Sequence, residues 1–242
     1  MRHLLALACL VFAQHARADA PRVAVDIPAV HSLVAQVMGD LGAPVFVMKP
    51  GASPHGYALR PSEAQILASA DILIWIGADQ SPWLAHAHAN LAPSALSLEL
   101  LEDPSTQVLP ARSGIAFSDS DPHDHGAHDP HAWLDPVNAQ GWLAAIAAAL
   151  ASRDPANAAT YAANAANARA DLAALTDEIT ADLKPYAGTG FITFHDAFQY
   201  FEARFSLPAT AAISLTDAAP PGPARIAALR ALMADRQITC AF

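Results

Sequence analysis

Positive charge is the scarcest feature of this chain. Its 242 residues include 13 lysines and arginines against 23 aspartates and glutamates, and the formal net charge is −10. This balance argues against a nucleic-acid partner, because the phosphate backbone is also negative. A net negative charge suits a cationic ligand. The alternative is an acidic surface that is solvated and binds nothing. Only 15% of the residues are charged and 53% are hydrophobic, which predicts packed lobes rather than a disordered chain.

Long hydrophobic runs are also missing. The N-terminal run from Leu4 to Ala13 has about ten residues, whereas a membrane-spanning helix needs about 20. It follows a short basic start and precedes the triplet "ADA" at residues 18–20, a small-x-small pattern typical of signal-peptide cleavage. We therefore predict a signal peptide over residues 1–20, cleaved after Ala20, and a periplasmic mature protein. A membrane anchor is the alternative that the short run disfavours.

Cysteine is nearly absent. Cys9 lies inside the predicted signal peptide, and the apolar run before it is too short for a lipoprotein signal. Removal of the signal peptide leaves Cys240 as a single thiol in an oxidising compartment. Cys240 is then either a buried, inert thiol or a cysteine whose partner is missing from the chain.

Strands and helices alternate along the first half of the chain. The segment "DILIWIG" (71–77) is a continuous apolar run, the pattern of a parallel strand buried on both faces. The segment "RVAVDIP" (22–28) alternates as a strand does, and residues 29–42 and 62–70 have helical patterns. This order predicts an α/β fold, with a mostly parallel sheet flanked by helices in a first lobe over residues 21–150.

Three further segments complete the predicted organisation. Residues 103–129 are rich in Pro, Ser, Asp, Gly and His, which predicts a mobile surface loop. The alanine-rich residues 151–187 predict a long helix of about 45 Å that joins two lobes or, alternatively, belongs to a bundle within one lobe. Residues 188–242 alternate strands with helices, and the last expected strand stops at Phe242. We expect a second α/β lobe that is incomplete.

Three histidines lie at the ends of predicted strands or loops: His55 in "SPHGYALRPSE", His131 in "DPHAWLDP" and His195 in "TFHDAFQYF". In open α/β sheets, ligands gather at the carboxyl ends of strands, and His195 directly follows the strand expected over residues 190–194. A helix is expected from Asp196 to Phe205. Imidazole is a common zinc ligand. Spacing alone leaves a joint metal site open, because none of the three shows the pattern of a zinc finger or an "HExxH" helix.

A second group of histidines, His123, His125 and His128, lies among aspartates within residues 119–129. This segment has no apolar anchor, so it cannot hold the three rings in one rigid geometry. Either it captures cations weakly at several sites, or it is a solvated polar loop.

The segments "SPHGYALRPSEAQILASADILIWIGAD", "DPHAWLDPVNA" and "ITFHDAFQYFEARF", in this order and with an acidic histidine-rich stretch among them, closely resemble the zinc-binding substrate-binding proteins of bacterial ABC transporters. The resemblance covers nearly all of the mature chain. It implies two α/β lobes joined by one long rigid helix, with one metal ion clamped between the lobes. By resemblance, His55 and His131 are ligands from the first lobe and His195 is a ligand from the second. Histidine rather than carboxylate at the third position favours zinc over manganese.

The family pattern is incomplete in this chain. Family members commonly complete the site with a carboxylate from a later loop, and many have a disulfide partner for Cys240 in the same region. Both would follow Phe242. The acidic residue often found soon after the "IG" strand is not clearly matched, although Ser81 and Asp79 lie close to its place.

The resemblance implies a periplasmic, non-enzymatic protein that captures Zn²⁺ as cargo and delivers it to an ABC permease and its ATPase. We expect a monomer that meets the membrane only through the permease. Asp129 and Asp196 adjoin two of the ligands and are expected to orient them, and residues 119–129 would collect zinc weakly. Two alternatives are a three-histidine zinc hydrolase, since three histidines and a water also describe a catalytic site, and a periplasmic zinc buffer without a transporter.

Overall fold

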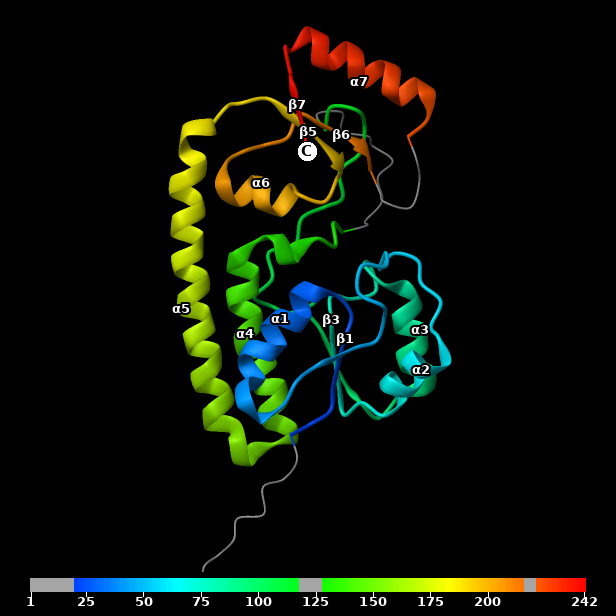
Figure 1. The fold of residues 1–242 in the computed structure, drawn as a ribbon, viewed down its shortest axis with the longest axis vertical. Coiled ribbons are helices and arrows are strands. Elements are labelled where there is room, and N and C mark those ends of the chain that lie inside the picture. The colour runs from blue at the N-terminus through cyan, green and yellow to red at the C-terminus, as the bar shows by residue number, and fades with distance from the viewer. Residues whose placement is uncertain (1–19, 118–127, 216–220) are drawn as a thin grey trace, which may run out of the picture.

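The computed structural model describes residues 20–117, 128–215 and 221–242, and Figure 1 shows two α/β lobes beside one long helix. The predicted signal peptide, apart from its last residue, lies outside the described residues, as do His123 and His125. Within the described ranges, no helix combines the length and the apolar character needed to cross a membrane.

The first lobe contains a four-stranded parallel sheet in the order β2-β1-β3-β4. Every residue of β3 is buried, and successive side chains enter different clusters: Ile72 and Ile74 pack on one face of the sheet, Leu73 and Trp75 on the other. This two-sided burial explains the continuous apolar run in the sequence and confirms the predicted strand. The four strands are β1 (Val23–Val25), β2 (Val45–Phe46), β3 (Ile72–Trp75) and β4 (Leu96–Glu99).

Helices cover both faces of this sheet. Four helices do so, and each has proline in its first turn, where the fixed φ and the missing N–H of proline cost nothing. Asp135 additionally caps the fourth, because its carboxylate accepts a hydrogen bond from the Val137 N–H at 2.9 Å. One face is covered by α1 (Pro28–Met38, followed by the 3-10 turn η1, Gly39–Leu41) and α4 (Pro136–Arg153), the other by α2 (Pro61–Ala68) and α3 (Pro82–Leu91).

The second lobe contains a three-stranded parallel sheet in the order β6-β5-β7. Its core is small and includes Ile192, Ala211, Leu229 and Ile238. Cys240 is exposed, so the first of the two alternatives for it, a buried, inert thiol, is wrong. The elements of this lobe are β5 (Phe191–His195), α6 (Gln199–Phe205), β6 (Ala211–Ser214), α7 (Pro223–Asp235) and β7 (Cys240–Ala241).

One long helix, α5 (Ala158–Leu183), joins the two lobes. Its 26 residues span about 39 Å at 1.5 Å per residue. It packs along α4 and α1 and runs past both lobes in Figure 1, which confirms the joining helix rather than the bundle alternative. The 3-10 turns η3 (Pro155–Asn157) and η4 (Lys184–Tyr186) flank it. Before its first turn, the Asp154 carboxylate accepts hydrogen bonds from the side chains of Tyr161 (2.8 Å) and Asn157 (2.7 Å).

The sequence prediction missed one strand, β4, and placed the start of α6 too early. β4 has no counterpart in it, because all four residues of this edge strand are half-buried and the strand is defined by its pairing with β3. α6 begins at Gln199 rather than at Asp196. The Asp196 N–H donates to the Ser214 carbonyl at 3.0 Å, which continues the pairing of β5 with β6 one residue past His195.

The described part of the predicted loop is not a free surface loop. Residues 103–117 contain no helix or strand, as expected. Thr106 and Gln107 are hydrogen-bonded to α4 of the first lobe, whereas residues 112–115 are anchored on the second lobe. Ile115 packs against the core of that lobe, and Arg225 of α7 donates to the Gly114 carbonyl at 3.1 Å. The segment around Gly114 thus associates with the second sheet rather than the first, although it lies within the predicted first lobe. The predicted division into a first lobe (21–150), a joining helix (151–187) and a second lobe (188–242) stays a prediction.

Candidate metal centre

The structure brings together the three histidines that the sequence singles out. His55 lies in the loop between β2 and α2, His131 immediately precedes the 3-10 turn η2 (Ala132–Leu134), and His195 is the last residue of β5. One ring nitrogen from each lies within 4.8 Å of the others. The ring centroids are 5.0 Å apart for His131 and His195, and 5.7 Å apart for His55 and His131. The cluster therefore combines loops of the first lobe with a strand end of the second.

The His55 loop is held by the start of α3. The carbonyl of Pro54 accepts hydrogen bonds from the Trp83 indole at 2.8 Å and from the Ser81 hydroxyl at 3.2 Å. Tyr57 follows two residues later, and its hydroxyl donates to the buried Glu63 carboxylate at 2.7 Å. These contacts fix the backbone on both sides of His55. Ser81, near the place of the expected acidic residue, thus positions the loop through Pro54.

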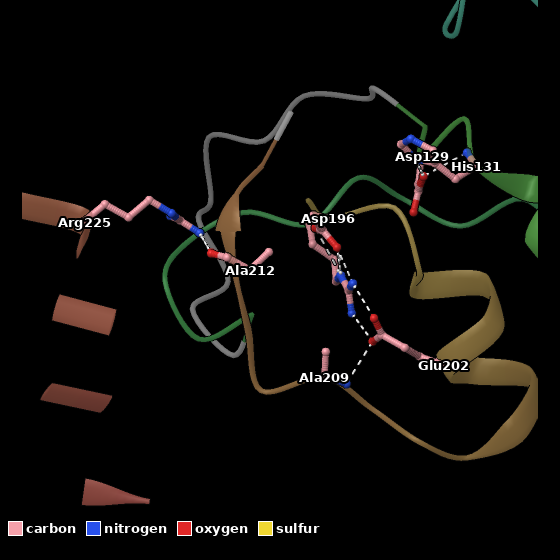
Figure 2. Close-up of polar contacts among 8 residues, drawn as sticks. Asp129, His131, Asp196, Glu202, Ala209, Ala212 and Arg225 are labelled. Atoms are coloured by element: carbon pink, nitrogen blue, oxygen red, sulfur yellow. Dashed lines mark hydrogen bonds and ion pairs between the residues drawn. The ribbon is translucent and has the colours of Figure 1, made fainter. Parts of the chain in front are cut away.

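His131 is oriented by Asp129, as the sequence predicts for this aspartate. The His131 ring Nδ1 lies 2.7 Å from Asp129 Oδ1, and the His131 backbone N–H donates to the same oxygen at 3.0 Å (Figure 2). A carboxylate oxygen accepts, so Nδ1 carries the proton and Nε2 is the nitrogen that can bind a metal. The exposed fractions are 6% for His131 and 4% for Asp129. The Tyr200 hydroxyl donates to the Asp129 carbonyl at 2.6 Å and fixes this turn.

Asp196, the second predicted orienting residue, makes its side-chain hydrogen bonds to Arg112. The guanidinium donates through Nε at 3.0 and 3.2 Å to the two carboxylate oxygens of Asp196, and a further contact joins Nη2 to Asp196 Oδ1. It also donates to Glu202 at 2.6 and 3.0 Å. Figure 2 shows Asp196 and Glu202 facing one another across these contacts. The Ala209 N–H donates to the same Glu202 oxygen, Oε2, that accepts from Nη1 of Arg112. Arg112 thus links the first half of the predicted loop to β5 and α6.

Burial and the neighbouring opposite charges shift the pKa values of Asp196 and Arg112 in opposite directions. Burial raises the pKa of Asp196 above its ordinary value, although the hydrogen bonds and charge of Arg112 lower it. For Arg112, burial alone would lower the pKa, but Glu202 and Asp196 together raise it above its ordinary value. Because a guanidinium stays protonated in proteins, Arg112 places one positive charge between the two carboxyl groups beside the histidine cluster.

A cavity of about 200 Å³ contains the three histidines together with Asp79, Arg112, His128, Asp129 and Asp196. His128 Nδ1 lies 3.2 Å from Asp79 Oδ2, and about half of each side chain is exposed. His128 is the one member of the predicted collecting group that the described residues include. It borders the same cavity as the three-histidine cluster but does not belong to that cluster.

Sequence reasoning missed Arg112 and Glu202 and left Asp79 unassigned. Arg112 did leave a signal, because it is the single arginine or lysine in the acidic stretch 103–129. Its partners lie 84 and 90 positions along the chain. No local pattern could have paired them.

Comparison with known families decides the assignment. The model of the family described as "ZnuA: Zinc-uptake complex component A periplasmic" matches residues 23–242. The chain belongs to this family. It is 42% identical to the high-affinity zinc uptake system protein ZnuA of Paracoccus denitrificans (strain Pd 1222), with 99% of this chain and 80% of that protein covered. It is 32% identical to ZnuA of Brucella abortus (strain 2308), with 91% and 75% covered. The resemblance drawn from the three motifs is therefore confirmed.

Solved structures share the ZnuA fold with this chain. A crystal structure of ZnuA matches with a TM-score of 0.78 at 24% identity, covering 91% of this chain and 81% of that one. The Zn(II)-bound ZnuA-like domain of Streptococcus pneumoniae AdcA matches with a TM-score of 0.73 at 24% identity, covering 92% and 78%. These matches concern the fold, and they confirm the predicted two-lobed α/β architecture with its joining helix.

Proposed function

We propose that this protein captures Zn²⁺ in the periplasm and delivers it to an ABC permease and its ATPase. The observation that carries the proposal is the convergence of His55, His131 and His195 from both lobes to within 4.8 Å. Membership of a family named for zinc uptake supports the same conclusion. Zinc is the cargo of such a protein, which works as a monomer and catalyses no reaction.

Zinc capture requires only a small contraction of the cluster. A tetrahedral zinc bound at 2.0–2.1 Å by each nitrogen would hold the nitrogens about 3.4 Å apart, compared with the present separations of up to 4.8 Å. His131 is already oriented by Asp129, so its ordering adds little to the cost of binding. The partly exposed His55 and His195 complete the set, and water or a carboxylate fills the fourth position.

The structure favours binding over hydrolysis. A zinc hydrolase needs a general base that can reach the metal-bound water. The buried carboxylates that line the cavity are Asp129 and Asp196, and each is occupied by donors, Asp129 by His131 and Asp196 by Arg112. The third carboxylate that lines the cavity, Asp79, lies 3.2 Å from His128 Nδ1, so each of the three carboxylates already has a partner. A periplasmic zinc buffer without a transporter would depend mainly on residues 119–129, most of which lie outside the described residues.

His128 and Asp79 support a role for one rim of the cavity as the zinc entrance. Both are about half exposed and border the histidine cluster. An imidazole and a carboxylate can hold a divalent cation, but two exposed side chains without further ligands hold it weakly. We expect zinc to pass this pair on its way to the three histidines.

The proposal is tested by zinc titration calorimetry of the mature chain. We expect one tight site, which survives deletion of residues 118–127 and loses affinity on the order of 100-fold or more in His195→Ala, because a missing ligand costs more than a missing orienting partner. The deletion must stop before Asp129, since this carboxylate orients His131. The control is His86→Ala, an exposed histidine on α3 outside the cavity.

Two outcomes would contradict the proposal. Tight binding that survives His195→Ala but disappears with residues 118–127 would place the site in the histidine-rich segment and favour the buffer. Delivery is tested with the same variants in a bacterium that lacks its own zinc-uptake binding protein. The unaltered chain should restore growth under zinc chelation and His195→Ala should not; equal growth of the two would separate the cluster from transport.

A further inference from the structure

Asp196 is the carboxylate that the fold places directly after one proposed ligand, His195. It lines the same cavity as the three histidines and is 8% exposed. A buried carboxylate in this position would ordinarily be attracted to a bound divalent cation, because oxygen ligands and negative charge both favour the ion. What occupies the Asp196 oxygens therefore bears on which metal the cavity accepts.

Arg112 occupies both oxygens of Asp196. The guanidinium contacts Oδ1 and Oδ2 and uses its remaining donors on Glu202, which in turn accepts from the Ala209 N–H at 3.0 Å. The side chains of Arg112, Asp196 and Glu202 are 14%, 6% and 4% exposed. Bidentate contacts between a guanidinium and carboxylates are among the strongest in proteins, and little water is present here to replace them.

From this arrangement, we infer that Arg112 sets the metal preference of the cavity by withholding the Asp196 carboxylate from the ion. This inference rests on the proposed zinc site and adds a specificity-determining residue to it. With Asp196 engaged, the cavity offers imidazole nitrogens, which suit zinc. If Asp196 were released, the site would gain a hard oxygen ligand of the kind that suits manganese.

The decisive comparison is between Arg112→Met and the double variant Arg112→Met with Asp196→Asn. Zinc and manganese affinities are measured by titration of each metal alone, with Arg230→Met, an exposed arginine on α7, as the control. We expect Arg112→Met to narrow the preference for zinc over manganese by at least tenfold, mainly through tighter manganese binding. The double variant should return to the wild-type ratio, because asparagine is a weak metal ligand. Arg112→Lys keeps the positive charge but loses the bidentate hydrogen bonding of the guanidinium. Its preference for zinc over manganese should lie between that of Arg112→Met and that of the wild-type chain.

A readout of coordination separates this role from a merely structural one. Cobalt-loaded protein absorbs visible light strongly when four-coordinate and weakly when more oxygen ligands enter. Arg112→Met should therefore lower the cobalt absorption, and the double variant should restore it. An unchanged ratio of zinc to manganese affinity in folded Arg112→Met would overturn the inference. An equal change of this ratio in the single and double variants would also overturn it, because the charge of Arg112 would then act without Asp196.

The single variant Asp196→Asn keeps the test informative if Arg112→Met fails to fold. Arg112 keeps its contacts with Glu202 in this variant. We expect zinc affinity to fall less than tenfold and the number of oxygen neighbours of zinc, from X-ray absorption, to stay the same. Loss of an oxygen neighbour together with a larger fall in affinity would show that Asp196 already binds the metal and overturn the inference. Absence of tight zinc binding by the wild-type chain would instead contradict the proposed function itself.

Discussion

Asp129 is the residue on which the orientation of His131 depends most directly. It holds both the ring Nδ1 and the backbone N–H of His131 through one oxygen. In metal sites, outer partners of this kind fix the tautomer and raise the basicity of the ligand nitrogen, and their loss typically costs about 10–100-fold in metal affinity.

We predict that Asp129→Asn weakens zinc binding by about 10–100-fold without unfolding the protein. Asparagine keeps an oxygen that can accept a hydrogen bond but loses the negative charge that favours a basic Nε2 on His131. Competition against a zinc chelator measures the change, and Asp177→Asn, an exposed aspartate on α5, is the control. Equal affinities of the two variants would mean that Asp129 does not tune the ligand.

At the residue scale, the sequence singled out three histidines that the structure places together, and each of them stands beside an informative neighbour. Their role as metal ligands stays a prediction. Asp129 is two positions from His131, so a local motif contains the contact. Asp196 was also expected to orient a ligand, but its side-chain hydrogen bonds go to Arg112, 84 positions away. Contacts of this range arise from the packing of the lobes and leave no periodic signal.

At the element scale, Asp26 joins the ends of the two central strands of the first sheet. Its carboxylate accepts the Ile27 N–H at 2.7 Å and the Ile76 N–H at 2.9 Å, and it is 1% exposed. Burial raises the pKa of Asp26 to about 6, although the backbone hydrogen bonds act in the opposite direction. The folded state therefore holds this proton more tightly than the unfolded chain, in which an aspartate titrates near pH 3.9.

This difference predicts a pH dependence of stability. As the pH rises from about 4 to about 6, the unfolded chain releases the proton first and gains stability relative to the folded state. The contribution of Asp26 to the free energy of unfolding should fall by about 3 kcal/mol across this window, at about 1.4 kcal/mol per pKa unit. Denaturant unfolding of wild type and Asp26→Asn at pH 4 and pH 7 measures it, since other titrating groups cancel in the difference. The raised pKa of Asp26 would be contradicted if the difference in free energy of unfolding between wild type and Asp26→Asn stayed constant with pH, or if it grew in favour of wild type as the pH rises.

Elements with a strong pattern of their own were predictable, and elements defined by their neighbours were not. β3 is buried on both faces and α5 is rich in alanine, so hydrophobicity and helix propensity identify them. β4 is a half-buried edge strand that pairs with β3 residue by residue, with a hydrogen bond of 3.0 Å from the Trp75 indole to Ser97. Before α6, Asp196 still pairs with β6 through its N–H and the Ser214 carbonyl, a contact between residues 18 positions apart that no local pattern contains.

At the scale of the whole molecule, the two lobes are braced at several points around the cavity. α5 joins them covalently, Arg204 of α6 donates to Asp135 at the start of α4 at 2.8 and 2.7 Å, and Tyr200 of α6 links Leu109 and Asp129. The arrangement holds a strand end of the second lobe opposite loops of the first. A site divided in this way requires both lobes for tight binding.

The most direct test of the account is X-ray absorption spectroscopy at the zinc edge of the protein loaded with one equivalent of Zn²⁺. We predict about three imidazole nitrogens at 2.0–2.1 Å, with one imidazole lost in each of His55→Ala, His131→Ala and His195→Ala. A spectrum that shows fewer imidazoles in the wild-type protein, or that does not change in His195→Ala, would contradict the claim that histidines from both lobes hold a single zinc ion.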